Sequence, residues 1–319
     1  MKLRSLIFSL LLVSGQVAGQ TYPTKAVRIL VPAQPGGGLD LVGRTMADQL
    51  GRALGQSFIV ENSGGGGGAI AAMAVARAAP DGYTLMVGYV GTHATNPATR
   101  KVNYDAVKDF TPIAMVGGTP NLIVVNPSVP VQDLKGLVER AKANPGKLIY
   151  GSGGIGTLNH LIWDQFRAAA GFEAVTAHYR GIGPAFIDLL SGNVEVMTPG
   201  LAAAMPHLRT KKAKPLAITG YKRHPLLPDV PTFEESGYRG FDGVQWYGIV
   251  GPAKMPEPVV RRLNEEINKV LATPTLRERF AGEAIDPMPM SPAEFGRFIQ
   301  SEIARWSKLA HERGISLDE

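Results

Sequence analysis

The stretch "KLIYGSGGIGTLNH", residues 147–160, joins a short apolar run to a helical pattern through a glycine-rich turn. The same order of apolar strand, glycine turn and helix occurs around "PAQPGGGLD" (32–40) and "NSGGGGGAI" (62–70). Strands that alternate with helices are typical of a parallel, doubly wound sheet. The sequence therefore predicts an α/β fold.

The same alternation extends along most of the chain. We expect strands at 26–33, 57–62, 83–90, 121–126, 147–151, 174–179, 194–198, 215–220 and 243–252. We expect helices at 39–55, 69–79, 131–143, 157–170, 183–190, 201–209, 256–273 and 291–314. Short strands near 117–123 and 218–244 would let the chain pass between two α/β lobes, and such crossings act as hinges.

The start of the chain is typical of a secretory signal peptide. Lys2 and Arg4 precede the apolar run "LIFSLLLV" (6–13), and small residues follow up to Gly19. The apolar run is too short to span a bilayer, so we predict cleavage near Gly19 and export to the periplasm. No later segment is long and apolar enough for a membrane helix, so we expect a soluble mature protein.

The bulk composition excludes several classes of protein. The 319 residues are 45% hydrophobic and 19% charged, which suits a packed globular protein. There are no cysteines, so disulfides and thiolate chemistry are excluded. The formal net charge is +6, but the basic runs at 209–214 and 221–224 carry no interleaved aromatic platforms. We interpret them as solvated loops and expect no nucleic-acid partner.

The turn after residue 150 has the G-x-G-x-x-G spacing of a dinucleotide site. The acid expected about 20 residues later would be Glu173, which lies in a turn before the next strand. A phosphate-binding loop is excluded because Thr157 stands where lysine is required. A smaller anion such as a carboxylate fits better: amides at 153–157 and the Ser152 and Thr157 hydroxyls would clamp it. The alternative is a tight turn capped by Thr157.

The first glycine turn allows the same two interpretations. Gly36, Gly37 and Gly38 precede a helix start, and adjacent glycines exceed what a helix cap needs, so we favour ligand binding there. For "GGGGG" we favour close packing or a mobile turn. Asp40 is expected to cap its helix rather than to bind an anion.

Catalytic and metal-binding patterns are missing from the sequence. The six histidines form no H-x-H or H-E-x-x-H motif, and there is no G-x-S-x-G elbow. A Ser152–His160 pair is conceivable, but nothing identifies an acid that would orient the histidine. We expect no enzyme activity, no metal and no cofactor.

The chain resembles a known family from about residue 22 to 315. The motifs that carry the resemblance are "VPAQPGGGLD", "PDGYTLMVG", "THATNP", "YDAVKDFTPIA", "ANPGKLIYGSGGIGTLNHL", "YRGIGPAFIDLLSGNVEVM" and "PLAITGYKRHPLLPDVPTFEESGY". These look like the Bug family, the solute-binding receptors of tripartite tricarboxylate transporters. The combination of "PDGYTL", "YDAVKDFTPIA" and "LPDVPT" is highly specific.

The resemblance implies a type II periplasmic binding protein with two α/β lobes, a hinge and a ligand cleft between them. It places lobe 1 at 20–121 and 222–319 and lobe 2 at 122–221. It implies that the cleft is lined by two glycine loops and three further segments. The implied ligand-binding residues are Gly36, Gly37, Gly38, Thr92, Ser152, Gly153, Gly156, Thr157, Tyr179, Arg180, Gly181 and Thr198.

Two departures from the family pattern bear on the ligand. Gly38 and Leu39 stand where a pair rich in Pro, Ser and Thr is usual, which removes a hydroxyl. Thr198 and Pro199 stand where an Asp is common, which argues against an amino-acid ligand.

The sequence therefore predicts a monomeric periplasmic receptor that captures a small organic acid for a membrane permease of the tripartite tricarboxylate type. A ligand sensor without a transport role, and a secreted hydrolase, are the alternatives.

Overall fold

The computed structural model describes residues 22–36 and 38–315. Its strands are β1 (Val27–Val31), β2 (Phe58–Asn62), β3 (Thr84–Tyr89), β4 (Phe110–Pro120), β5 (Leu122–Val125), β6 (Ile149–Ser152), β7 (Val175–His178), β8 (Val196–Met197), β9 (Lys214–Ile218), β10 (Val244–Pro252) and β11 (Asp286–Pro287). Its α-helices are α1 (Gly38–Leu54), α2 (Ala69–Ala76), α3 (Asn96–Thr99), α4 (Leu134–Ala143), α5 (Leu158–Ala170), α6 (Ile182–Ser191), α7 (Leu201–Arg209), α8 (Glu257–Ala272), α9 (Pro274–Gly282) and α10 (Pro292–Arg313).

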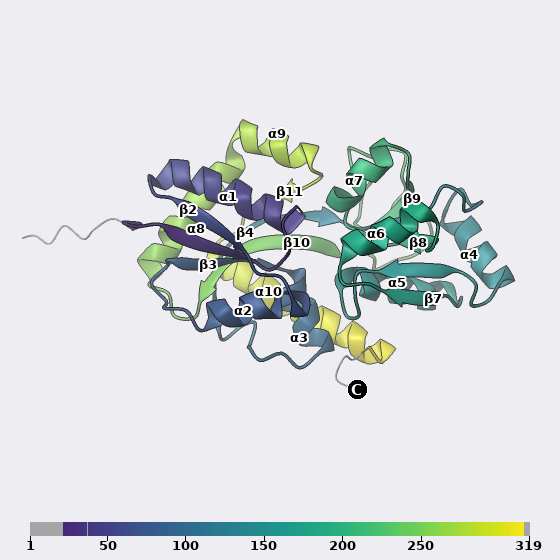
Figure 1. Cartoon of the computed structure of the whole chain (residues 1–319), viewed down its shortest axis with the longest axis horizontal. Coiled ribbons are helices and arrows are strands. Elements are labelled where there is room, and N and C mark those ends of the chain that lie inside the picture. Colours follow the sequence, from purple (N-terminus) through teal and green to yellow (C-terminus); the bar gives the residue numbers. More distant parts are fainter. Residues whose placement is uncertain (1–21, 37, 316–319) are drawn as a thin grey trace, which may run out of the picture.

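Two sheets divide the described chain into two halves (Figure 1). The first sheet has the order β11-β4-β10-β3-β1-β2, and the second has the order β7-β6-β8-β5-β9. Helices cover both faces of each sheet, as the alternation of strands and helices predicts. The predicted two-lobed α/β fold is confirmed.

The sheets are mixed, whereas the alternation of strands and helices indicates a parallel, doubly wound sheet. β1 lies parallel to β2 and β3, but β10 runs antiparallel to β3 and β4. In the second sheet β5 is antiparallel to β8 and β9. The short strand β11 is also antiparallel to β4, so antiparallel pairing is not confined to the strands next to the crossings.

Most predicted elements lie within a few residues of their observed bounds. The predicted strand at 26–33 is β1, and the helix at 39–55 is α1. Ser291 and Glu294 form a capping box at the start of α10, which matches the predicted helix at 291–314. The sequence reasoning missed β4, α9 and the single π-helical turn Gly91–Thr95 that follows β3.

The helix α10 belongs to the core. Phe295, Ile299 and Trp306 are buried, and α10 packs against β4 in the first half and against α5 in the second. Figure 1 shows this helix passing beneath both halves. Burial of these large side chains stabilises the helix by about 2 kcal/mol per side chain.

The chain crosses between the halves twice. One crossing leads from β4 to β5 through Asn121, and the other leads from β9 to β10. Part of the segment after β9 stays with the second half: Ile218 pairs with Thr232, and Phe233 packs on Phe166 of α5. The predicted lobe limits at 121/122 and 221/222 stay predictions, and we propose that the second crossing lies nearer to Gly243.

The predictions on export and on membrane helices concern the ends of the chain and its longest apolar helices. The predicted signal peptide, residues 1–19, lies outside the described residues. Within residues 22–36 and 38–315, no helix is long and apolar enough to cross a bilayer.

Candidate functional site

The glycine turn 151–157 lies beside the loop that precedes α6. The Tyr179 amide donates to the Ser152 carbonyl (2.9 Å), and the Gly181 amide donates to the Gly153 carbonyl (3.0 Å). β6 and β7 are parallel neighbours, so the loops that follow them meet at one edge of the sheet. The N-terminal ends of α5 and α6 therefore lie close together.

Several polar groups of this turn are bonded within the turn. Ser152 Oγ accepts from the Gly154 amide (3.1 Å) and donates to the Gly154 carbonyl (3.0 Å). The single hydrogen of the Thr157 hydroxyl is shared between the Gly154 carbonyl (2.6 Å) and Asn159 Oδ1, and Thr157 is the N-cap residue of α5 without bonding a helix amide through its side chain. The alternative interpretation, a tight turn capped by Thr157, therefore holds for the position of the cap residue but not for a side-chain bond to a helix amide.

Asn159 is a candidate site residue that the sequence reasoning missed. Its Oδ1 accepts from the Thr157 hydroxyl and from the His160 amide (2.9 Å), so its Nδ2 is directed toward Gly153. A Cβ built on Gly153 would lie 2.9 Å from that Nδ2 and 3.4 Å from the Ile182 amide nitrogen. Two N–H donors from α5 and α6 thus converge beside Gly153. A polar residue in the first turn of a helix after a glycine loop is the signal that identifies it.

His160 supports the turn from the side of α5. The Gly156 amide donates to its Nδ1 (3.1 Å), and its ring lies edge-on to His178. Burial lowers the pKa of His160 to about 4, with a smaller contribution from His178. The ring is therefore neutral at pH 7, with Nδ1 free of a proton and able to accept this bond.

The first glycine turn lies at the N-terminal end of α1, which Figure 1 places at the boundary with the second half. Gly36 has a left-handed φ of 93°, and its amide donates to Asp40 Oδ2 (3.0 Å). Asp40 also accepts from Arg44 and Asn62. Burial alone would raise the pKa of Asp40, but these hydrogen bonds outweigh it and lower the pKa. The prediction that Asp40 caps its helix was wrong, because Asp40 lies inside the first turn of α1 and its carboxylate accepts from the Gly36 amide instead.

Gly38 lies against Tyr247 of β10, a second residue that the sequence reasoning missed. A Cβ built on Gly38 would lie 2.9 Å from the Tyr247 hydroxyl oxygen. Tyr247 is 4% exposed, and burial raises its pKa, so the hydroxyl keeps its proton at pH 7. Gly37, also predicted to bind the ligand, lies outside the described residues.

Thr92 and Thr198 are both fully buried, with their hydroxyls bonded inside the protein. Thr92 Oγ1 lies 2.8 Å from His93 Nδ1 within the π-helical turn. Thr198 Oγ1 donates to the Asn159 carbonyl (2.6 Å) and lies next to the Tyr150 hydroxyl. Neither hydroxyl is directed into open space, and Thr198 instead holds the first turn of α5.

Tyr179, Arg180 and Gly181 take different positions around the start of α6. The Tyr179 hydroxyl donates to Asp188 within α6. Arg180 is exposed and makes no hydrogen bond or ion pair with any residue of 22–36 or 38–315. Gly181 is the N-cap residue of α6, with a left-handed φ of 118° that favours glycine.

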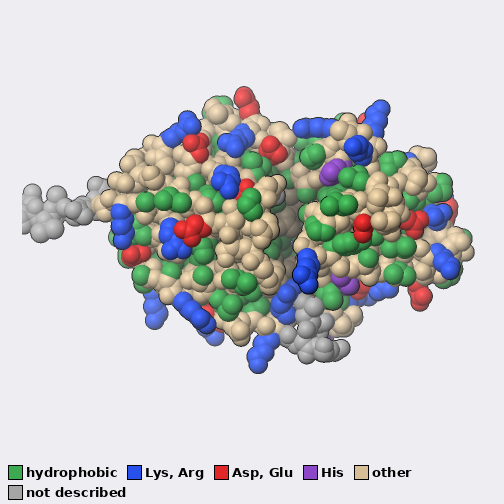
Figure 2. Space-filling model, in the orientation of Figure 1, with side chains coloured by type: hydrophobic (Ala, Val, Ile, Leu, Met, Phe, Trp, Pro, Cys, Tyr) green, Lys and Arg blue, Asp and Glu red, His purple; other side chains and the backbone are tan. Residues whose placement is uncertain are grey.

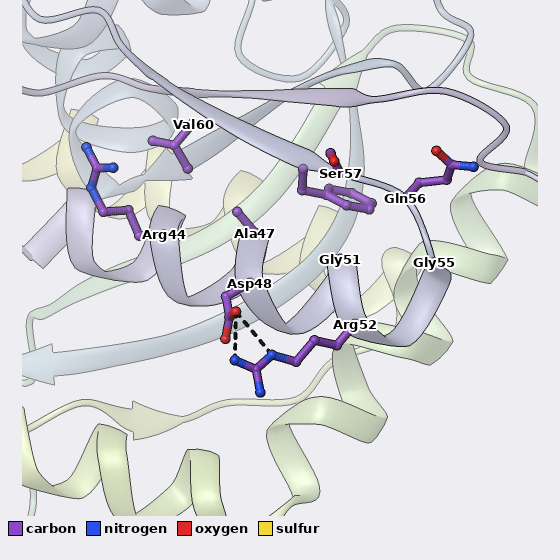
Figure 3. A pocket seen from close by; sticks show the side chains of 10 residues that line it. Arg44, Ala47, Asp48, Gly51, Arg52, Gly55, Gln56, Ser57 and Val60 are labelled. Atoms are coloured by element: carbon purple, nitrogen blue, oxygen red, sulfur yellow. Dashed lines mark hydrogen bonds and ion pairs between the residues drawn. The ribbon is translucent and has the colours of Figure 1, made fainter.

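Figure 2 shows a groove between the two halves, with basic side chains at its lower end. A separate hollow of about 650 Å³ lies on the outer side of α1 and the edge strand β2 (Figure 3). Its charged side chains Arg52 and Asp48 pair with each other, and it lies at the far end of α1 from Gly38. The groove, where the donors of α5 and α6 converge, is the candidate site. No cluster of side chains suited to a metal ion occurs in the part of the chain that the structure describes.

Comparisons with known proteins identify the family of the chain. Residues 42–315 match the model of the family described as "Tripartite tricarboxylate transporter family receptor". The chain is 32% identical to protein BugT of Bordetella pertussis over 307 residues, which cover 96% of this chain and 94% of BugT.

Two similar structures were solved with an organic acid. One is Rpa4515 of R. palustris with adipate, with a TM-score of 0.88, 34% identity and coverage of 92% of this chain and 99% of that chain. The other is MatC from Rhodopseudomonas palustris with bound malate, with a TM-score of 0.83, 33% identity and coverage of 90% and 99%.

Proposed function

Since the chain belongs to the tripartite tricarboxylate transporter receptor family, as its motifs predict, we propose that it captures one small organic carboxylate in the groove between its halves. The observation that carries the proposal is the convergence of Asn159 Nδ2 and the Ile182 amide beside Gly153. N–H groups at helix N-termini favour anions, because the helix dipole places partial positive charge there. The similar structures with adipate and malate support a carboxylate as that anion.

We propose that the protein works by closure rather than by catalysis. Ser152 Oγ is bonded to the backbone of Gly154, and His160 Nδ1 accepts from Gly156. A nucleophile needs a base within hydrogen-bonding reach, and these bonds hold both candidates in supporting roles. Carboxylate binding from both halves would favour the closed arrangement, which a membrane permease can distinguish from the open one.

We propose that the receptor works in the periplasm as a monomer and delivers its ligand to a permease of the tripartite tricarboxylate type. The match of the receptor family model to residues 42–315 supports the delivery of a ligand to such a permease. Uptake of the bound acid by cells with and without the gene tests it. Unchanged uptake together with altered gene expression would instead indicate a sensor.

The ligand is tested by thermal unfolding with a panel of mono-, di- and tricarboxylates that includes adipate and malate. A ligand that binds only the folded protein at one hundred times its Kd stabilises it by about 2.7 kcal/mol, so a true ligand raises Tm clearly. Native mass spectrometry of the isolated protein checks the monomeric mass and any ligand that copurifies. If no carboxylate changes Tm and none copurifies, the proposal is wrong.

The variant Asn159→Asp tests the donor that we assign. It keeps an oxygen for Thr157 and His160 but replaces the Nδ2 donor with an acceptor that repels a carboxylate. A hydrogen bond to a charged group contributes about 1.5–3 kcal/mol, so the Kd should rise by at least about tenfold. Gln165→Glu is the matched control, because Gln165 lies on the same helix and bonds to Gly240 instead. Equal affinities of Asn159→Asp and wild type would exclude Asn159 from the site.

A further inference from the structure

Arg100 makes a hydrogen bond that spans the groove. It is the C-cap residue of α3 in the first half, and its Nη2 donates to the carbonyl oxygen of Ile155 (3.1 Å). Ile155 belongs to the glycine turn 151–157 in the second half. Because the donor and the acceptor belong to different halves, this bond exists only while the halves lie close together.

The bonded peptide group is held from both sides. The carbonyl of the Ile155–Gly156 peptide accepts from Arg100, and its amide donates to His160 Nδ1 (3.1 Å). A peptide group is planar, so fixing its carbonyl and its amide fixes its orientation. Gly156 has a left-handed φ of 71°, which allows the chain to continue from this peptide into α5. The glycine turn 151–157, which leads into Asn159 of α5, is therefore held in part by a residue of the opposite half.

Arg100 lies beside the "GGGGG" turn. A Cβ built on Gly67 would lie 3.5 Å from Arg100 Nη1, and the Gly67 carbonyl accepts from Asn96 (2.8 Å) and from Tyr89 (3.0 Å). The tighter neighbours of that Cβ would be the amide atoms of Asn96, Oδ1 at 3.1 Å and Nδ2 at 3.3 Å. Across residues 22–36 and 38–315, Arg100 has no acidic partner within ion-pair distance, and its Nε is buried without a hydrogen bond. The Ile155 carbonyl is therefore its partner across the groove.

We propose that Arg100 is an interlobe latch, a positioning residue that holds the Ile155–Gly156 peptide when the two halves close. This proposal rests on the proposed function, since it assigns a means of closure to the same site. A bond formed only in the closed state slows opening and leaves the first encounter with the ligand unchanged. Loss of the latch should therefore raise the dissociation rate rather than lower the association rate.

The kinetic test uses Arg100→Gln, Arg100→Lys and the control Arg77→Gln, with adipate as the probe and stopped-flow fluorescence of the native tryptophans. Arg77 is an exposed arginine in the same half, at the C-cap of α2. We expect Arg100→Gln to release adipate about tenfold faster, since the lost bond has a charged donor, with a similar association rate. Arg100→Lys keeps a charged donor and should restore part of the slow release.

A second test needs no ligand, so it separates failure of the latch from failure of the proposed function. Hydrogen exchange of the Gly156 amide and an interlobe spin-label distance are compared in the unliganded proteins. We expect Arg100→Gln to speed this exchange and to widen the distance distribution, whereas Arg77→Gln matches wild type. If Arg100→Gln matches wild type in both measurements, the latch is overturned. If it weakens adipate binding but leaves both unchanged, Arg100 contacts the ligand directly and the latch is equally wrong.

Discussion

At the scale of the residue, the motifs predict where a hydroxyl-bearing residue lies, but not which groups its hydroxyl bonds. The resemblance assigned Thr198 to the ligand, yet its hydroxyl lies among Tyr150, Asn159 and the buried side of α5. These partners come from two segments of the chain, β6 and α5, that are distant from Thr198 in sequence. A motif places a residue at the end of a strand, but the direction of its hydroxyl depends on neighbours distant in sequence.

The substitution Thr198→Val tests this structural role. Valine has the same shape but no donor, so the Asn159 carbonyl loses a buried hydrogen bond worth about 1 kcal/mol or more. We expect the free energy of unfolding in urea to fall by about 1–2 kcal/mol. Thr275→Val, at an exposed position in α9, should leave it within about 0.5 kcal/mol of wild type. Equal stability of the two variants would contradict the role.

Two buried histidines predict how stability depends on pH. Burial lowers the pKa of His93 to about 3 and that of His160 to about 4, against about 6.5 in an unfolded chain. Above pH 6.5 both rings are neutral in both states. Below pH 6.5 the histidines of the unfolded chain bind protons, whereas those of the folded chain stay neutral. The free energy of unfolding therefore decreases as the pH is lowered, by up to about 1.4 kcal/mol per pH unit for each histidine.

The variant His93→Gln isolates one of these contributions. Urea unfolding at pH 7.5, 6.0 and 5.0 should show a smaller loss of stability on acidification than in wild type, because glutamine binds no proton. His311→Gln, an exposed change, should keep the wild-type slope. A slope in His93→Gln equal to that of wild type would contradict the buried, neutral histidine.

At the scale of the element, helical periodicity and glycine turns were enough to predict α1, α5 and β6. The strand β4 was missed because "FTPIAMVGGTP" contains Pro and Gly and shows no alternation. Its extended form comes from pairing with β10, which lies more than a hundred residues later and has register shifts at Tyr247/Gly248 and Ile249/Val250. The convergence of Asn159 with Ile182 was equally hidden, because it requires β6 and β7 to be neighbours.

Close packing of α1 on the first sheet can be tested with two glycines of the same helix. A Cβ on Gly43 would lie 2.5 Å from Val31 Cγ2, whereas a Cβ on Gly51 would meet nothing closer than the Gln56 carbonyl at 3.4 Å. We expect Gly43→Ala to lower stability by about 1–3 kcal/mol, because Val31 is buried and cannot move freely. Gly51→Ala should raise it by about 0.5–1 kcal/mol, the usual effect of replacing glycine in a helix. Thermal unfolding checks both, and a stabilising Gly43→Ala would show that α1 can move away from β1.

At the scale of the whole molecule, the two crossings are joined by one threonine. The Asn121 amide donates to Thr219 Oγ1 (2.8 Å), and Thr219 Oγ1 donates to the Gly243 carbonyl (2.7 Å). Trp306 of α10 and Ile162 of α5 pack on Gly243 from opposite halves. A buried hydroxyl thus joins the two crossings, and we propose that the backbone pivots around it when the halves close.

The substitution Thr219→Val removes that connection without changing the size of the side chain. It leaves the Asn121 amide and the Gly243 carbonyl buried without this partner, so the free energy of unfolding should fall by about 1–3 kcal/mol. The Asn121 amide should also exchange its hydrogen faster, because its acceptor is gone. Thr219→Ser keeps the hydroxyl and should retain slow exchange at Asn121 despite a small loss of packing. If Val and Ser exchange alike, the Thr219 hydroxyl does not hold the crossings together, and the pivot must lie elsewhere in 119–122 or 218–244.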